Sequence, residues 1–227
     1  MTSRSTPLAR PFGSKAPGDP PAPWPWLRWL MTLASAAIAV YASQYFFHRP
    51  EGHFGEHFRL LLGHVSGGSI ALLFGPWQFS DRLRARALGL HRWFGRIYLA
   101  GVALGSIAGF GLALFSDKGL PTHLGFGILA VLWFATGLMA YVRIRQGEVQ
   151  SHRDWMTRNF ALTLAAVTLR IYLPLSFAAH VAFAPAYITI SWLCWVPNLL
   201  VAEWLIRRRA RLAQNERGLD PRHFGVR

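Results

Sequence analysis

Long apolar stretches dominate the chain, and short polar segments separate them. Six windows are each long enough to cross the hydrocarbon core of a bilayer, which needs about 20 apolar residues of helix. Lipid cannot satisfy exposed backbone groups, so such segments are predicted to be α-helices. The predicted fold is an all-α, polytopic membrane protein with six transmembrane helices, at 27–47, 60–79, 95–115, 121–142, 155–177 and 184–206.

Basic residues alternate between the connecting segments, and this alternation predicts the orientation of the chain. Lys and Arg total 20 in one set of segments and 3 in the other, with Arg170 as the remaining one. Because cytoplasmic loops are enriched in Lys and Arg, both termini are predicted to be cytoplasmic. The rich set is 1–28, 80–96, 143–158 and 207–227, and the poor set is 48–59, 116–121 and 178–183.

The two ends of the chain are predicted to be tails that flank one transmembrane domain, 27–206. Residues 1–26 are rich in Pro, Ala, Ser and Gly, as is typical of a disordered cytoplasmic tail. Residues 207–227 begin with RRRAR and are predicted to form a basic cytoplasmic tail close to anionic headgroups.

Composition supports a membrane location and excludes several other classes. Of 227 residues, 52% are hydrophobic and only 15% charged, which argues against an ordinary soluble domain. The net charge of +14 does not predict a nucleic-acid partner, because the basic residues lie between apolar runs. The single cysteine, Cys194, excludes an internal disulfide, a CxxCH haem attachment motif and a thiolate zinc cluster.

Four of the nine histidines are distributed one to each of the second to fifth windows. His64 and His123 fall near the predicted outer surface. His91 and His152 fall just before their windows, on the predicted cytoplasmic side. The chain therefore carries two histidines near each membrane surface.

An internal repeat relates these histidines. The segments HRWFGR, from residue 91, and HRDWMTR, from residue 152, both read His-Arg, then Trp, then Arg three residues after the Trp. His64 and His123 are each followed by Gly four residues later. Such a parallel repeat predicts a central four-helix bundle of spans two to five with a pseudo-two-fold axis along the membrane normal.

Diagonal helices of that bundle would place His64 opposite His123 and His91 opposite His152. Opposed imidazoles are a ligand set for a flat metal cofactor such as haem. The third window also carries Gly101, Gly105 and Gly109, whose small size suits a macrocycle. Close packing of two helices explains the same glycines equally well.

Five arginines are candidate partners for an anionic cofactor. Arg170 lies within a predicted span, where a charged side chain is costly and is a functional-site hypothesis by default. A haem propionate near the outer histidines would pair with it; the alternatives are snorkelling to the surface and hydrogen bonding to backbone carbonyls freed by Pro174. Arg96 and Arg158, with neighbouring Arg92 and Arg153, could hold the propionates of an inner haem, or could simply be interface charges.

The segments HVSGGSIALLFGPWQF, HRWFGRIYLAG and HRDWMTRNFALTLAAVTLRIYLP resemble domain-of-unknown-function family 2306, a family of bacterial multi-pass membrane proteins. The resemblance covers about residues 55–175. It implies a location in the bacterial cytoplasmic (inner) membrane but no activity. His64, His91, His152, Arg96, Arg158 and Arg170 match its motifs.

The architecture is also similar to cytochrome b-561, a six-helix family that passes electrons across membranes. That similarity implies one or two b-type haems, with His64 and His123 ligating the outer one and His91 and His152 the inner one. The implied function is a transmembrane oxidoreductase that takes electrons from a quinol or small reductant and passes them to a metal or protein acceptor.

Two other interpretations remain open. The first outer segment, HRPEGHFGEHF, offers His48, His53, Glu56 and His57 as zinc ligands, although a solvated polar loop has the same composition. Alternatively, the chain is a non-enzymatic transporter, a quinone- or lipid-binding protein, or an assembly factor, in which the histidines are structural.

Overall fold

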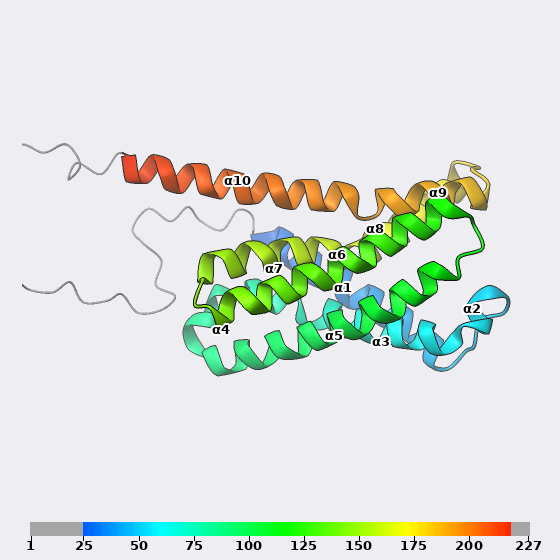
Figure 1. The fold of residues 1–227 in the computed structure, drawn as a ribbon, viewed down its shortest axis with the longest axis horizontal. Coiled ribbons are helices and arrows are strands. Elements are labelled where there is room, and N and C mark those ends of the chain that lie inside the picture. The colour runs from blue at the N-terminus through cyan, green and yellow to red at the C-terminus, as the bar shows by residue number, and fades with distance from the viewer. Residues whose placement is uncertain (1–24, 219–227) are drawn as a thin grey trace, which may run out of the picture.

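A computed structural model describes residues 25–218, and these residues form helices with no strand among them. The helices lie side by side along the long axis of the molecule (Figure 1), which confirms the all-α class. The α-helices are α1 (Pro25–Ala42), α2 (His53–Glu56), α3 (Phe58–Phe74), α4 (Asp81–Arg86), α5 (Leu88–Leu114), α6 (Leu120–Arg145), α7 (Val149–Thr163), α8 (Ala165–Ala178), α9 (Phe183–Leu193) and α10 (Val196–Gly218), with 3₁₀ turns η1 (Ser43–Phe46) and η2 (Pro76–Phe79).

Five helical segments of the described chain are long and apolar enough to cross a membrane, rather than the six predicted. They are Phe58–Phe79, Leu88–Leu114, Leu120–Arg145, Val149–Ala178 and Phe183–Asn215, which correspond to predicted spans two to six. The first predicted span is not among them; its α-helix ends at Ala42 and gives way to η1. This leaves α1 with 18 residues.

Helices α5 and α7 begin earlier than hydropathy predicts. The third predicted span started at residue 95 and the fifth at 155, whereas the helices begin at Leu88 and Val149. His91 and His152 therefore lie inside helices rather than just before them, which corrects that expectation. Helices α5 and α7 can include these charged first turns because the arginines of the turns, such as Arg92 and Arg153, are exposed.

Two antiparallel hairpins, α3–α5 and α6–α7, pack together mainly through α5 and α6. We call the end at which α5 begins and α6 ends the basic end. Helix α1 covers α3 and α8, and α9 and α10 cover α6, α7 and α8. The start of α1 and the end of α10 lie toward the same end of the molecule (Figure 1).

The helices of predicted spans five and six are each interrupted in the middle. Side-chain hydrogen bonds to backbone carbonyls link the two interruptions. Span five breaks at Leu164, ten residues before Pro174, so the proline does not cause it. Asn198 Nδ2 donates to the Ala161 carbonyl oxygen at 3.3 Å and to that of Cys194 at 3.0 Å. Thr168 Oγ1 also donates to the Cys194 carbonyl. These side chains satisfy carbonyls that lipid could not.

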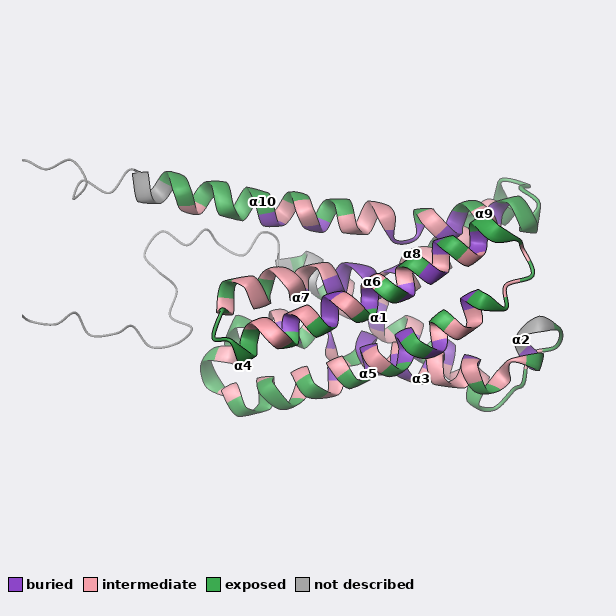
Figure 2. Ribbon diagram, in the orientation of Figure 1, coloured by how far each residue is buried: buried purple, intermediate pink, exposed green. Residues whose placement is uncertain are grey.

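The predicted tails are tested only in part. Residues 1–24 and 219–227, which hold most of the predicted N-terminal tail and the end of the C-terminal one, lie outside the described residues. Helix α10 continues to Gly218, so the first part of the predicted basic tail is helical. Its surface beyond residue 206 is mostly exposed (Figure 2).

Candidate functional site

A hydrogen-bonded polar cluster joins α5, α6 and α7 in the middle of the protein. Tyr98 Oη donates to Asn159 Oδ1 at 2.5 Å and lies 3.0 Å from Thr163 Oγ1. Trp133 Nε1 donates to Thr163 Oγ1 at 2.9 Å. Asn159 Nδ2 donates to the Trp133 carbonyl oxygen at 2.7 Å and to Thr136 Oγ1 at 2.8 Å. Satisfied polar groups of this kind fix how helices face one another in a membrane.

Sequence reasoning missed this cluster, although the repeat contained a signal for it. Tyr98 and Asn159 are 61 residues apart, which is the offset between His91 and His152. Two polar residues that are separated by the repeat offset, each inside an apolar window, would have indicated a contact between the two copies of the repeat.

His91 and His152 lie on the basic side of this cluster, in matching positions. Each precedes its member of the Tyr98–Asn159 pair by seven residues (98 − 91 and 159 − 152). Seven residues are nearly two helical turns, or about 10 Å of rise. Both histidines therefore lie at the same depth as each other and on the same helix face as the paired residues, and His152 lies within electrostatic range of His91.

The two imidazoles differ in their hydrogen bonds. His152 Nδ1 lies 2.8 Å from the Ala140 carbonyl oxygen. Because a carbonyl only accepts, this nitrogen carries the proton and Nε2 keeps its lone pair in the neutral ring. His91 Nδ1 is buried and has no hydrogen-bond partner.

The surroundings of this pair are basic. Arg84, Arg92 and Arg153 all lie within electrostatic range of His91. Arg84, which the sequence did not indicate, donates to the Gln78 carbonyl oxygen at 2.9 Å and to Asp81. Gln78 Nε2 is a second buried nitrogen without a partner. The two imidazoles at the basic end are thus surrounded by cationic side chains.

His64 is held against α5 and α6. Its Nδ1 lies 2.8 Å from the Gly105 carbonyl oxygen, and its ring meets that of Trp133 edge to face at 6.4 Å. A Cβ on Gly109 would lie 2.7 Å from the same nitrogen. His64 therefore fits only because position 109 is a glycine.

His123 lies elsewhere, in a groove of about 600 Å³. It precedes Trp133 on α6 by ten residues, or about 15 Å of helical rise. His64 is at the depth of Trp133, so the structure does not bring His64 and His123 together. The groove is otherwise apolar and runs between α5 and α6, with Phe110, Leu114, Leu120, Leu124, Gly127, Ile128, Val131 and Leu132 as its remaining lining.

The glycine stripe of α5 serves close packing. A Cβ on Gly67 of α3 would lie 2.3 Å from Gly105 N and 2.5 Å from Gly101 O, so the two backbones touch. A Cβ on Gly105 would lie 2.9 Å from the Trp133 ring. Of the two explanations for the stripe, the structure supports helix packing.

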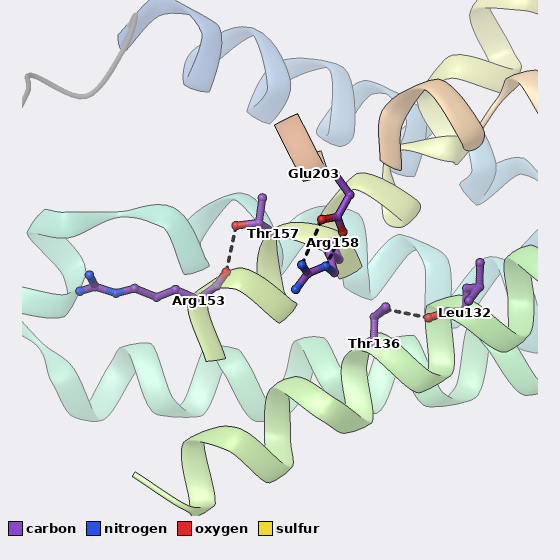
Figure 3. Close-up of polar contacts among 6 residues, drawn as sticks. All are labelled: Leu132, Thr136, Arg153, Thr157, Arg158 and Glu203. Carbon is purple, nitrogen blue, oxygen red and sulfur yellow. Dashed lines mark hydrogen bonds and ion pairs between the residues drawn. The ribbon is translucent and has the colours of Figure 1, made fainter. Parts of the chain in front are cut away.

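Arg158 and Arg96 are engaged by protein groups rather than turned toward the histidines. Arg158 Nε and Nη2 donate to the two carboxylate oxygens of Glu203 at 2.5 and 3.1 Å, and Arg153 points away from this pair (Figure 3). The guanidinium of Arg158 lies 4.6 Å from the Trp155 ring, and that of Arg96 lies 5.2 Å from the Trp93 ring. The repeated Trp-Arg spacing therefore produces cation–π pairs.

Arg170 lies beside His64 at a small cavity between α1, α3 and α8. Its Nη1 donates to the Ala166 carbonyl oxygen of its own helix at 3.0 Å, and its guanidinium lies 5.9 Å from the Tyr41 ring. No ion pair formed by the described residues includes it.

The first loop gives no support for the zinc hypothesis. His57 stacks on Phe115, with ring centroids 4.1 Å apart. The side chain of His53 is not described. Within the described part of the chain, no three His, Cys, Asp or Glu side chains gather as a metal-ligand set.

Comparison with known proteins gives a family and no activity. The model of a family described as predicted membrane protein (DUF2306) matches residues 61–206. No curated protein matches the chain, and no solved structure matches it, so the similarity to cytochrome b-561 gains no support.

Proposed function

Because the chain belongs to the DUF2306 family of predicted membrane proteins, whose description gives no activity, we propose a function from the geometry: an integral membrane electron carrier that holds one b-type haem between His91 and His152. The observation that carries the proposal is the matched position of these two imidazoles on α5 and α7. Each lies two turns from the Tyr98–Asn159 hydrogen bond, at one depth.

The matched histidines at the basic end support a haem there better than the histidines at the opposite end do. His152 is anchored to a carbonyl in the way that metal-ligating imidazoles are, and the buried His91 Nδ1 has no protein partner. By contrast, His64 and His123 differ in depth by about 15 Å. The cavity beside His64 holds only about 40 Å³, far too little for a macrocycle. We therefore propose one haem rather than two.

The residues of the chain have separate parts in this proposal. His91 and His152 would hold the haem iron, and the Ala140 carbonyl fixes the orientation of the His152 ring. Arg92 and Arg153 would balance the propionate charges, a role that Arg84 and Arg158 cannot share because Asp81 and Glu203 engage them. A bis-imidazole haem supplies one-electron transfer when bound. A single cofactor at one surface favours exchange with a partner at that surface.

The proposal includes the topology that the charge distribution predicts. The basic end would face the cytoplasm of a bacterial inner membrane. Helix α1 would be a sixth span, so that both termini lie on the cytoplasmic side. This arrangement is supported by the start of α1 and the end of α10 lying toward one end of the molecule (Figure 1).

An absorption spectrum of purified protein, expressed with added haem precursor, tests the proposal. We expect a Soret band, low-spin bands on reduction, and one haem per chain. His91→Ala and His152→Ala should each lose the low-spin spectrum. His123→Ala and His57→Ala should keep it, because the structure places both rings away from the pair. A wild-type protein without a Soret band, or a spectrum that survives in both ligand variants, would reject the proposal.

A second candidate function rests on the groove between α5 and α6. Its volume of about 600 Å³ lies within the roughly 300–1,000 Å³ typical of ligand sites, and its lining is apolar apart from His123. An apolar molecule with one polar group, such as a quinone or a lipid, matches that lining.

Filling the groove tests this candidate. A Cβ on Gly127 would lie 3.9 and 4.0 Å from Phe110 and Ala113, so Gly127→Leu enters the groove without meeting backbone. We expect mass spectrometry of extracts from purified protein to recover several-fold less quinone or lipid per chain than from the wild type. Gly89→Leu, at an exposed glycine with open space around it, is the control. Equal recovery from both variants would reject this candidate.

A further inference from the structure

A small polar cavity lies between α1, α3 and α8, away from the His91–His152 pair and from the α5–α6 groove. It measures about 40 Å³, and a water molecule needs about 10–15 Å³ on this scale. The cavity therefore has room for a few non-hydrogen atoms. Its lining is Ile38, Ala42, His64, Val65, Gly68, Ser69, Leu72, Ala166 and Arg170.

The positive charge at this cavity has no negative partner within the described chain. The guanidinium of Arg170 has five N–H donors, and the hydrogen bond described for it goes to the Ala166 carbonyl oxygen of its own helix. All four ion pairs of the described residues involve other cations. An uncompensated cation at membrane depth is costly, so a compensating anion would be strongly favoured.

A second polar group at the cavity also lacks a partner. Ser69 Oγ is buried and makes no hydrogen bond. A buried hydroxyl without a partner is costly, and it can donate to an anion. The ring of His64, held by its Nδ1 at the Gly105 carbonyl oxygen, forms another wall of the cavity.

We propose that this cavity binds one small inorganic anion, a halide or an oxyanion of a few atoms, through Arg170 and Ser69. The limited volume favours such an anion over larger ones such as lipid headgroups or carboxylic acids with long chains. The site is independent of the proposed haem, because neither His91 nor His152 lines it.

Thermal unfolding of the purified full-length protein in detergent tests the site, with tryptophan fluorescence as the signal. We expect Tm to rise saturably with sodium chloride or sodium nitrate when sodium gluconate keeps the ionic strength constant. Arg170→Gln should weaken the apparent affinity at least tenfold. Arg208→Gln should retain the wild-type response, because Arg208 is an exposed arginine that also lies against an aromatic ring, that of Trp204.

A milder substitution and a direct measurement of chloride binding keep the test decisive if Arg170→Gln fails to fold. Ser69→Ala should weaken the chloride response several-fold. In the wild type, ³⁵Cl NMR should show line broadening that nitrate reverses by competition. A wild-type Tm with no saturable response to chloride or nitrate would overturn the proposal. So would a wild-type response that persists in both Arg170→Gln and Ser69→Ala.

Discussion

At the scale of single residues, the buried polar side chains of this protein fall into two groups: those with a hydrogen-bond partner on a neighbouring helix and those without one. Tyr98, Asn159 and Thr163 are fully buried or nearly so and bond to one another. His91 Nδ1 and Ser69 Oγ are buried without partners. Satisfied groups stabilise the fold, whereas unsatisfied ones cost free energy unless a ligand pairs with them. A ligand at either unpartnered group would therefore stabilise the protein.

The Asn159 side chain is the central member of the satisfied cluster. We expect Asn159→Ala to lower the free energy of unfolding by about 1–3 kcal/mol, because it removes three hydrogen bonds to buried groups of Tyr98, Trp133 and Thr136. Denaturant titration in detergent, followed by helical circular dichroism, measures the change.

Thr157→Ala is the matched control for this prediction. Its hydroxyl, on the same helix, donates only to the Arg153 carbonyl oxygen one turn earlier, at 2.9 Å (Figure 3). The loss of that local bond should change stability by less than about 0.5 kcal/mol, as is usual for surface substitutions. Equal effects of the two alanines would show that the cluster contributes no more than a local bond.

At the scale of helices, the contact between α3 and α5 depends on glycine. Gly67→Ala would place a methyl group 2.3 Å from Gly105 N, which backbone atoms cannot yield without separating the helices. We expect a loss of about 1–3 kcal/mol or more, as for overpacking of a core. The adjacent Gly68→Ala meets nothing within 4 Å and should stabilise the helix by about 0.5–1 kcal/mol. Tm values of the two variants that shift in the same direction would contradict this account of the packing.

The sequence predicted helices well and their interruptions poorly. Hydropathy located spans two to six, because each needs a long apolar run to be stable in lipid. It could not locate the break at Leu164, which depends on Asn198 and Thr168 reaching carbonyls across the protein. A side chain bonded to a distant backbone group leaves no periodic pattern.

For the candidate site, the repeat was informative about one pair of residues and not about the other. His91 and His152 share a depth because both copies place the histidine seven residues before a paired polar residue. His64 and His123 were predicted to face each other by the same symmetry. Their helices differ in what surrounds each ring: Gly105, Gly109 and Trp133 enclose His64, whereas His123 borders an apolar groove. Sequence offsets alone do not reveal such differences in packing.

At the scale of the whole molecule, the number of spans decides on which side of the membrane each terminus lies. The helix pair α9–α10 returns the chain to the basic end, so six crossings place both termini on one side. Five crossings would separate them. Helix α1, with 18 residues, is the element on which this difference depends.

Labelling of single cysteines in intact cells by a membrane-impermeant maleimide tests the topology. Cys194 is buried and can first be replaced by alanine. We expect Ala182→Cys, between α8 and α9, to be labelled from outside, because that loop lies opposite the basic end. Gln146→Cys and Gln214→Cys, at exposed positions of the basic end and of α10, should react only after the cells are permeabilised. If α1 crosses the membrane, Ser14→Cys should react only after permeabilisation, as Gln214→Cys does. Labelling of Ser14→Cys in intact cells would mean that five helices, and not six, span the bilayer.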